Sequence, residues 1–349
     1  MKQIVKKIIT TLLTLVIVSF LLFLAFELIP GDPARAKLGT DATPEQLAAL
    51  RAQMGLNRPL MERYVTWLFA FFTGDFGTSY SYSMPVREMI LDKLPITVTL
   101  TVMAFFLMIV ISVPLAVFMA KHEGGIADSV FSGLNQVIMA VPSFFSGILL
   151  TLVFGVVLKL FVPGDFVSYD VNAGKFFAYL FFPAVAIALP KTAMAVKMLR
   201  SSLLAEMKHD YVRTAYSRGN DISGVLYGHV LKNAFLPVLT FFGMALADIF
   251  TGSIVVEKVF NIPGLGRILM TSISNRDYPV VEAIIMMMAL VVIVTNLCVD
   301  LIYRKIDPRI TAALNIKRST NLSPTGKAIR SKDSGSTKCV PCSYTSGTY

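Results

Sequence analysis

Asp248 is the residue whose position most suggests chemistry, because it lies in an otherwise uncharged apolar run at residues 234–256. A carboxylate inside a membrane helix is costly, and such residues usually face a cavity or a partner. The sequence leaves two interpretations open. Asp248 lines a substrate path, where it can meet an ammonium group, or it pairs with a neighbouring polar group.

Other charges in the apolar runs are expected to be structural. Glu282 and Asp300 lie near the two ends of a run, where a carboxylate reaches the interface cheaply. Lys191 and Lys197 lie toward one end of another run, and long lysine side chains can extend their ammonium groups to the interface. We therefore do not assign these four residues to a substrate path.

Motifs for catalysis are missing from the sequence. There is no H-E-x-x-H, no G-x-S-x-G and no G-x-x-x-x-G-K-[ST] phosphate loop. Cys339 and Cys342 form a single C-x-x-C, which supplies only two ligands, so it is either a metal or redox site or a reduced pair in a polar tail. We expect a chain that is not an enzyme, holds no metal and needs no cofactor of its own.

These residues must be positioned by membrane helices. Of the 349 residues, 55% are hydrophobic and 15% are charged, whereas soluble domains carry about 25% charged residues. Helices rise about 1.5 Å per residue, so roughly 20 apolar residues cross the hydrocarbon layer. We expect an all-α integral membrane protein with six transmembrane helices at residues 8–26, 96–120, 130–158, 177–199, 234–256 and 280–302, with a kink or break at Pro142.

Basic residues indicate the orientation of the spans. They precede the first run, cluster between residues 197 and 232, and follow the last run at 304–309. Cytoplasmic loops carry such an excess, which explains the net charge of +10 without invoking nucleic acid. Both termini are then cytoplasmic. The segment 30–95 has seven Lys/Arg and seven Asp/Glu, so we interpret it as a small extracytoplasmic element, with a short helix starting at Pro44.

The segment from residue 197 to 237 is the most informative for function. A helix is predicted to end at Gly219-Asn220, where a left-handed residue stops it. Asp221 or Ser223 can cap the helix that follows. Two short helices joined by a sharp turn form an element well shaped to dock into a groove on a soluble partner.

This segment resembles the EAA loop of bacterial ABC-transporter permeases. The pattern is Ala215-x-x-x-Gly219 followed by Leu236-Pro237. Tyr211-Val-Arg213-Thr214-Ala215 is similar to the Tyr-x-Arg-Thr-Ala of the dipeptide/oligopeptide/nickel branch, in which Arg-Thr replaces the Glu-Ala of the loop's name. Asn220 departs from the hydrophobic residue that more often follows the Gly.

Further motifs of the same branch occur in order along residues 1–310. They are Ile29-Pro-Gly-Asp-Pro33, Gly74-Asp-Phe-Gly-Thr-Ser79, Leu94-Pro-Ile-Thr-Val-Thr-Leu100, Val256-Glu-Lys-Val-Phe-Asn-Ile-Pro-Gly-Leu-Gly266, Arg276-Asp-Tyr-Pro279 and Asp307-Pro-Arg309. Each match alone is weak, but their order and spacing together are specific. The long outer loop points to the B-type partner of the two permeases in such systems.

The resemblance implies a type I importer permease in the bacterial cytoplasmic (inner) membrane. It implies three kinds of partner besides the lipid bilayer: a second permease subunit that completes a heterodimeric pore, two ATP-binding subunits and an extracytoplasmic substrate-binding protein. The residues expected to couple to the ATPase are Tyr211, Arg213, Thr214, Ala215, Arg218, Gly219, Leu236 and Pro237. Asp248 is the candidate for the substrate path, where it would meet the ammonium group of a peptide.

The organisation we expect has four parts: a membrane helix at 1–29, the extracytoplasmic element at 30–95, a five-span core at 96–303 with a coupling loop at about 200–233, and a disordered cytoplasmic tail at 304–349. The leading function is import of di- or oligopeptides. Nickel, glutathione or another small solute is the alternative within the family. A secondary transporter, or a membrane anchor without transport, is the alternative outside it.

Overall fold

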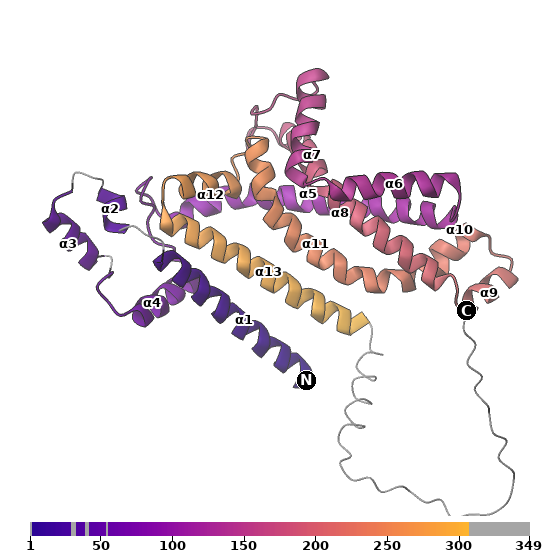
Figure 1. Cartoon of the computed structure of the whole chain (residues 1–349), viewed down its shortest axis with the longest axis horizontal. Coiled ribbons are helices and arrows are strands. Elements are labelled where there is room, and N and C mark those ends of the chain that lie inside the picture. The colour runs from indigo at the N-terminus through magenta and orange to yellow at the C-terminus, as the bar shows by residue number, and fades with distance from the viewer. Residues whose placement is uncertain (1, 29–32, 39–41, 54, 307–349) are drawn as a thin grey trace, which may run out of the picture. The chain divides into compact units, whose positions relative to one another are not determined.

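The computed structural model describes residues 2–28, 33–38, 42–53 and 55–306. Residues 307–349 of the expected tail, with Cys339 and Cys342, lie outside this part. The regular structure of the described residues is helical, with α-helices labelled α and π-helical segments labelled η (Figure 1). The elements are α1 (Lys2–Glu27), α2 (Pro33–Leu38), α3 (Pro44–Gln53), α4 (Leu60–Thr73), α5 (Val86–Lys121), α6 (Ile126–Ala140), α7 (Ser143–Leu150), η1 (Thr151–Val157), α8 (Ala173–Glu206), α9 (Asp210–Ser217), α10 (Ile222–Val225), η2 (Leu226–Val230), α11 (Leu231–Val259), α12 (Leu265–Ser274) and α13 (Tyr278–Ile306).

Five helices of the described residues are long and apolar enough to cross a membrane without a break. They lie at Val5–Glu27, Val86–Lys121, Ala173–Glu206, Ile222–Val259 and Tyr278–Ile302. A sixth crossing is possible if α6 and the helix that runs from Ser143 to Val157 count as one span, although the two are bent by 103°. The all-α membrane fold with six expected spans is confirmed, with the third span broken.

The break in the third span follows from Pro142. A proline disfavours the helical region for the residue before it, and Val141 is extended, with φ −88° and ψ 121°. Pro142 is itself extended and immediately precedes the first residue of α7. Two successive extended residues end one helix and start the next in a new direction, so the proline acts as a break rather than a mild kink.

The helices of the core are longer than the uncharged runs suggest. α5 begins at Val86, ten residues before the expected start at Ile96, and Pro95 lies inside it. α8 likewise contains Pro183 and Pro190. Proline is tolerated within membrane helices because neighbouring groups satisfy the freed backbone. The expected boundary at residue 95 therefore falls inside a helix.

α8 is the central helix of the core. It packs against α5, α6, α7 and α11 (Figure 1). The residues of the main apolar cluster lie mostly on α5, α8 and α11. Small side chains on α8 such as Ala184, Ala186 and Ala195 are completely buried there. Small residues let membrane helices approach closely. The core is therefore a tight bundle that holds α8 and α11 side by side.

α1 and α4 lie at the edge of the bundle. α1 packs along α13, and α4 contacts α1 through Tyr64, whose hydroxyl lies 2.8 Å from Ser19 Oγ. At the other end of α1, Lys7 forms an ion pair with Asp300, so Asp300 is paired near the end of its span. Glu282 lies close to Trp67 of α4. Both carboxylates are thus structural, as we expected, but they lie against other helices rather than extending to the interface.

The expected extracytoplasmic element contains α2, α3, α4 and a loop. α3 starts at Pro44, as predicted. Thr43 and Gln46 exchange side-chain and backbone hydrogen bonds of 3.1 and 3.3 Å, the capping box that stabilises a helix start. The loop after α4 begins at Gly74, whose positive φ of 81° ends the helix.

Candidate coupling surface and membrane pocket

α9 is held by a turn whose geometry the sequence predicts. Gly219 has φ +84°, a conformation that L side chains rarely adopt, and no atom lies within 4 Å of the position its Cβ would take. The Asp221 side chain accepts a hydrogen bond of 3.0 Å from the Gly224 N–H and caps the next helix. The Asn220 amide donates a 3.1 Å hydrogen bond to the carbonyl of Ala215. The unusual asparagine thus caps the end of α9.

The second helix of the element differs from our expectation. We expected two short helices, but α10 continues through η2 into α11, and the whole stretch Ile222–Val259 is one apolar helix. Only α9 is a short separate helix.

α9 has an exposed and a buried face. Val212 and Ala215 are 2% and 6% exposed and pack into the main apolar cluster. Ala215, which we expected to couple to the ATPase, therefore packs into the chain's own core and not on its outer surface. The outer face, which we call the α9 surface, consists of Arg213, Thr214, Tyr216, Ser217 and Arg218.

Tyr211 attaches α9 to the core. Its hydroxyl donates a 2.8 Å hydrogen bond to Glu206 Oε2 at the end of α8, and it also bonds to Asn233 of α11. Burial raises the pKa of the Tyr211 hydroxyl, so the proton needed for the bond to Glu206 is retained at neutral pH. Tyr211 is thus a structural support for the α9 surface.

The remaining residues of the resemblance lie away from the α9 surface. Leu236 is half-buried and Pro237 is exposed, both within the first two turns of α11. Asp248 follows Pro237 by eleven residues, which is about 16 Å along a helix. The structure therefore separates two features, the α9 surface and the surroundings of Asp248.

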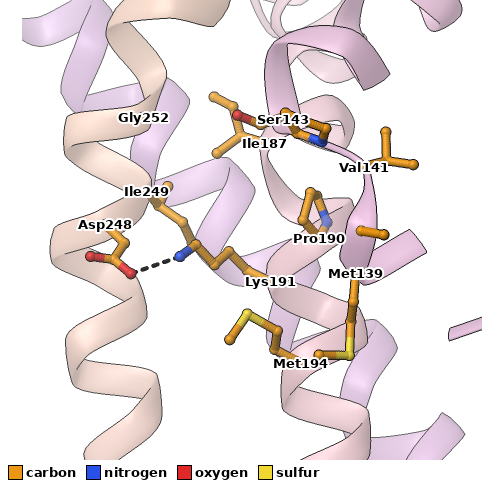
Figure 2. A pocket seen from close by; sticks show the side chains of 12 residues that line it. Met139, Val141, Ser143, Ile187, Pro190, Lys191, Met194, Asp248, Ile249 and Gly252 are labelled. Carbon is orange, nitrogen blue, oxygen red and sulfur yellow. Dashed lines mark hydrogen bonds and ion pairs between the residues drawn. The ribbon is translucent and has the colours of Figure 1, made fainter. Parts of the chain in front are cut away.

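Asp248 pairs with Lys191 in a pocket between helices. Lys191 Nζ lies 2.7 Å from Asp248 Oδ2, and Figure 2 shows the lysine reaching from α8 toward the carboxylate on α11. The pocket has a volume of about 310 Å³. It is lined by Met139, Ala140, Val141, Pro142, Ser143, Ile187, Pro190, Lys191, Met194, Asp248, Ile249 and Gly252.

Our expectation for Lys191 was wrong. We expected its ammonium group to extend to the interface, but it forms an ion pair within the span. The sequence contained a signal that we missed, since a lysine and an aspartate in neighbouring spans can each supply the charge the other needs. The pair combines both interpretations of Asp248, because the carboxylate has a polar partner and also lines a pocket. Lys197 Nζ, by contrast, lies 3.5 Å from Gln136 Oε1 and away from the pocket lining.

The sequence reading missed a buried carboxylate on the same helix as Asp248. Glu257 of α11 is 0% exposed and accepts hydrogen bonds of 2.6 Å from the Thr97 hydroxyl and 2.7 Å from the Gly266 N–H. Thr97 Oγ1 in turn accepts a bond from the Leu265 N–H. The carboxylate thus lies at the N-terminus of α12, where a helix favours negative charge. The motif that contains Glu257 was recognised, but its contact with Thr97, 160 residues away, is set by the tertiary fold.

Metal ligands do not gather in the described part of the chain. No group of three or more His, Cys, Asp or Glu residues there is placed to hold a metal ion. The Lys191 ammonium beside Asp248 also makes that carboxylate a poor cation site, because like charges repel. The pocket chemistry is that of a paired cation and anion.

Models of known protein families match both halves of the chain. A family model described as binding-protein-dependent transport system inner membrane component matches residues 112–312. A second model, described as the N-terminal segment of a binding-protein-dependent transport system membrane component, matches residues 1–101. The two models together cover the described helices except for residues 102–111 of α5.

Individual relatives match over most of their length. A probable peptide ABC transporter permease of Sinorhizobium fredii is 32% identical over 307 residues, which is 88% of this chain and 98% of the relative. The oligopeptide transport system permease AppB of Bacillus subtilis is 34% identical over 296 residues, with 84% and 94% covered. The glutathione transport system permease GsiC of Salmonella choleraesuis is 34% identical over 310 residues, with 89% and 99% covered.

Proposed function

This chain belongs to the binding-protein-dependent transport system inner membrane components, the permease subunits of ABC transporters, and we propose that it forms half of a pore that imports peptides. The observation that carries the proposal is the family assignment combined with relatives named for peptides. The pore needs a second permease subunit to complete it. The family assignment supports this role over a secondary transporter and over a membrane anchor without transport.

ATP-driven movement enters the chain through the α9 surface in this proposal. Two ATP-binding subunits dock beneath the pore, and one of them receives α9. Arg213 and Arg218 are exposed and suited to acidic groups on that subunit, while Tyr211 and Ala215 fix α9 to the core. Gly219 shapes the turn, and Leu236 and Pro237 belong to the span that carries the movement into the membrane.

The proposed docking of α9 on an ATP-binding subunit also sets the orientation of the chain in the membrane. The end of the bundle that carries α9 faces the cytoplasm, and the 30–95 element faces an extracytoplasmic binding protein that delivers the substrate. One loop on the cytoplasmic side, residues 121–129, carries more acidic than basic residues. Asp128 of this segment lies in the first turn of α6 and is 5% exposed, and Arg200 donates hydrogen bonds of 2.8 and 2.6 Å to its two carboxylate oxygens. Its charge is thus balanced by an arginine on the same side.

Glutathione is the second candidate substrate, favoured by the relative named for glutathione transport. It is itself a small peptide with an ammonium group and carboxylates, so both candidates share the chemistry that a Lys–Asp pair can recognise. Direct competition tests whether peptides and glutathione use the same path. Excess glutathione blocks uptake of a labelled alanine peptide only if the two share the path.

A growth experiment in the native host tests the proposal. A strain that lacks this chain and requires an amino acid is supplied with that amino acid only as di- to pentapeptides. We expect growth to be lost and to return when the wild-type chain is expressed. Growth on the free amino acid is the control. Undiminished growth on every peptide, in a strain with no other peptide importer, contradicts a role in peptide import.

A further inference from the structure

The Lys191–Asp248 pair lies deep within both of its helices. Lys191 is 18 residues from the start of α8 and 15 from its end, and Asp248 is 17 and 11 residues from the ends of α11. At about 1.5 Å per residue, each charge lies about 16 Å or more from either end of its helix, so neither is at a helix end where it could extend easily to the interface. Charged residues at that depth are expensive and face a bundle interior or a water-filled cavity.

The pair lies on an open wall of this chain, not in its core. The side chains of Asp248 and Lys191 are 60% and 26% exposed. Met244 and Val255 on the same face of α11 are 48% and 40% exposed. A half-exposed ion pair facing lipid would be costly, so this wall faces either the partner permease or the path between the two subunits. The pocket beside the pair favours the path.

We propose that the Lys191–Asp248 pair is a binding site for zwitterionic peptides, opened by the peptide itself. The substrate ammonium group takes the place of Lys191 on the Asp248 carboxylate, and the substrate carboxylate binds the freed Lys191 ammonium group. One ion pair is exchanged for two, and no net charge is added to the membrane interior. This inference rests on the proposed function and names the chemical class of its substrate.

Charge balance gives the site its selectivity. A peptide capped at its N-terminus carries only a carboxylate, so it can bind Lys191 but leaves Asp248 without a cation. A peptide amidated at its C-terminus leaves Lys191 without an anion. An unpaired charge in a low-dielectric site carries a penalty that a paired one avoids. Only a ligand with both charges satisfies both residues.

The pocket walls supply groups for the peptide backbone. The last turn of α6, at Met139 and Ala140, ends at the break, and carbonyl groups at a helix end have no partner within the helix. Pro190 has no N–H to donate to the carbonyl one turn earlier in α8. The volume of about 310 Å³ is at the lower end of the range for small-ligand pockets. These features fit a short peptide segment.

The test measures occupancy of the pocket in the complete transporter complex in nanodiscs. Native Cys298, Cys339 and Cys342 are replaced, and Ser143→Cys introduces one maleimide target in the pocket lining. The probes are alanine peptides of two or three residues, either free, N-acetylated or C-amidated, because the two termini of a longer extended peptide are too far apart to reach both members of the pair. Tyr169→Cys, at an exposed position outside the pocket, is the control for direct effects of peptide on labelling.

We expect free peptides to slow labelling of Ser143→Cys at concentrations at least about tenfold lower than either capped form, the loss expected for one charge-assisted bond. Asp248→Asn should remove the discrimination against N-acetyl peptides, and Lys191→Met that against amides. The exchange Lys191→Asp with Asp248→Lys should retain preference for free peptides. Lys197→Met, on the same helix but outside the pocket, should behave as wild type.

Equal protection by free and capped peptides would overturn the inference, as would selectivity unchanged in both Asp248→Asn and Lys191→Met. A pocket in which Ser143→Cys never reacts would also overturn it, because a substrate site must admit water-borne reagents. The yield and melting temperature of each complex show whether a single variant has merely lost its structure. In that case the charge-exchange variant decides whether the two residues set the selectivity. ATP-driven peptide uptake by the wild-type complex is measured in parallel. Uptake without selective protection rejects the site and leaves the proposed function standing.

Discussion

Asp277 is bonded to Ser79 although 198 residues separate them in the sequence. The Ser79 hydroxyl donates to Asp277 Oδ2 at 2.5 Å, and the N–H groups of Tyr80 and Ser81 donate at 2.9 and 3.2 Å. Asp277 is completely buried and lies just before α13. This one carboxylate therefore attaches the loop after α4 to the turn between α12 and α13.

Replacing Asp277 by Asn should loosen this attachment. The amide keeps the size of the carboxylate but turns one acceptor into a donor that faces other donors. A buried polar group left unsatisfied costs about 1–3 kcal/mol, so we expect a clear drop in the melting temperature of the purified chain. Asp92→Asn is the matched control, because the Asp92 side chain is 69% exposed. Equal melting temperatures for the two variants would show that the bonds of Asp277 contribute nothing to the stability of the chain.

Gly266 should not tolerate even a methyl group. A Cβ there would lie 2.4 Å from the carbonyl oxygen of Ile254, a backbone atom that cannot rotate away. Its N–H also donates to Glu257. We expect Gly266→Ala to destabilise the chain by about 1–3 kcal/mol, as overpacking does. In Gly133→Ala the new Cβ meets nothing within 4 Å, so a denaturation curve should show no loss of stability. An unchanged Gly266→Ala would mean that α11 and α12 are not packed this closely.

Gly219 provides a test of coupling that leaves the spans untouched. A β-branched residue with positive φ costs about 1–2 kcal/mol, and no neighbour adds a steric term at this position. Gly219→Val should insert normally but weaken ATPase docking or separate ATP hydrolysis from transport. Gly219→Asn should be milder, because asparagine tolerates this conformation. Hydrolysis and uptake are measured with and without loaded binding protein, and wild-type values for both in Gly219→Val would exclude the turn from coupling.

Membrane orientation can be tested with single cysteines in sealed cells after Cys298, Cys339 and Cys342 are replaced. Ser217→Cys lies on the α9 surface, and Tyr169→Cys lies in the exposed segment between η1 and α8. We expect an impermeant maleimide to label position 169 and not position 217, while lysed cells label both. The opposite pattern would place the α9 surface outside the cell and reject docking of an ATPase there.

Local chemistry explains which features could be predicted from the sequence. Apolar runs, the break at Pro142 and the left-handed Gly219 depend on neighbouring residues, and all three are present in the structure. The pairs Lys191–Asp248, Thr97–Glu257 and Ser79–Asp277 depend on how distant helices meet. A single sequence shows each member as a costly isolated group but does not say which partner satisfies it.

Ala215 illustrates the same limit within a recognised motif. Its spacing from Gly219 identifies the loop, but spacing alone does not say which face of α9 is turned inward. Packing against the main cluster decides that. The extent of α5 is a further case, because Pro95 suggests a helix start while the surrounding bundle supports a helix from Val86 onward.

ATP-driven accumulation of a labelled alanine peptide by proteoliposomes tests most directly the claim that this chain forms half of a peptide pore. The liposomes contain this chain, its partner permease and both ATP-binding subunits, with loaded binding protein on the outer side and ATP enclosed. We predict accumulation that requires ATP, stops when this chain is omitted and falls when the chain carries Gly219→Val. A complex that assembles and hydrolyses ATP but accumulates no peptide of two to five residues would contradict the claim.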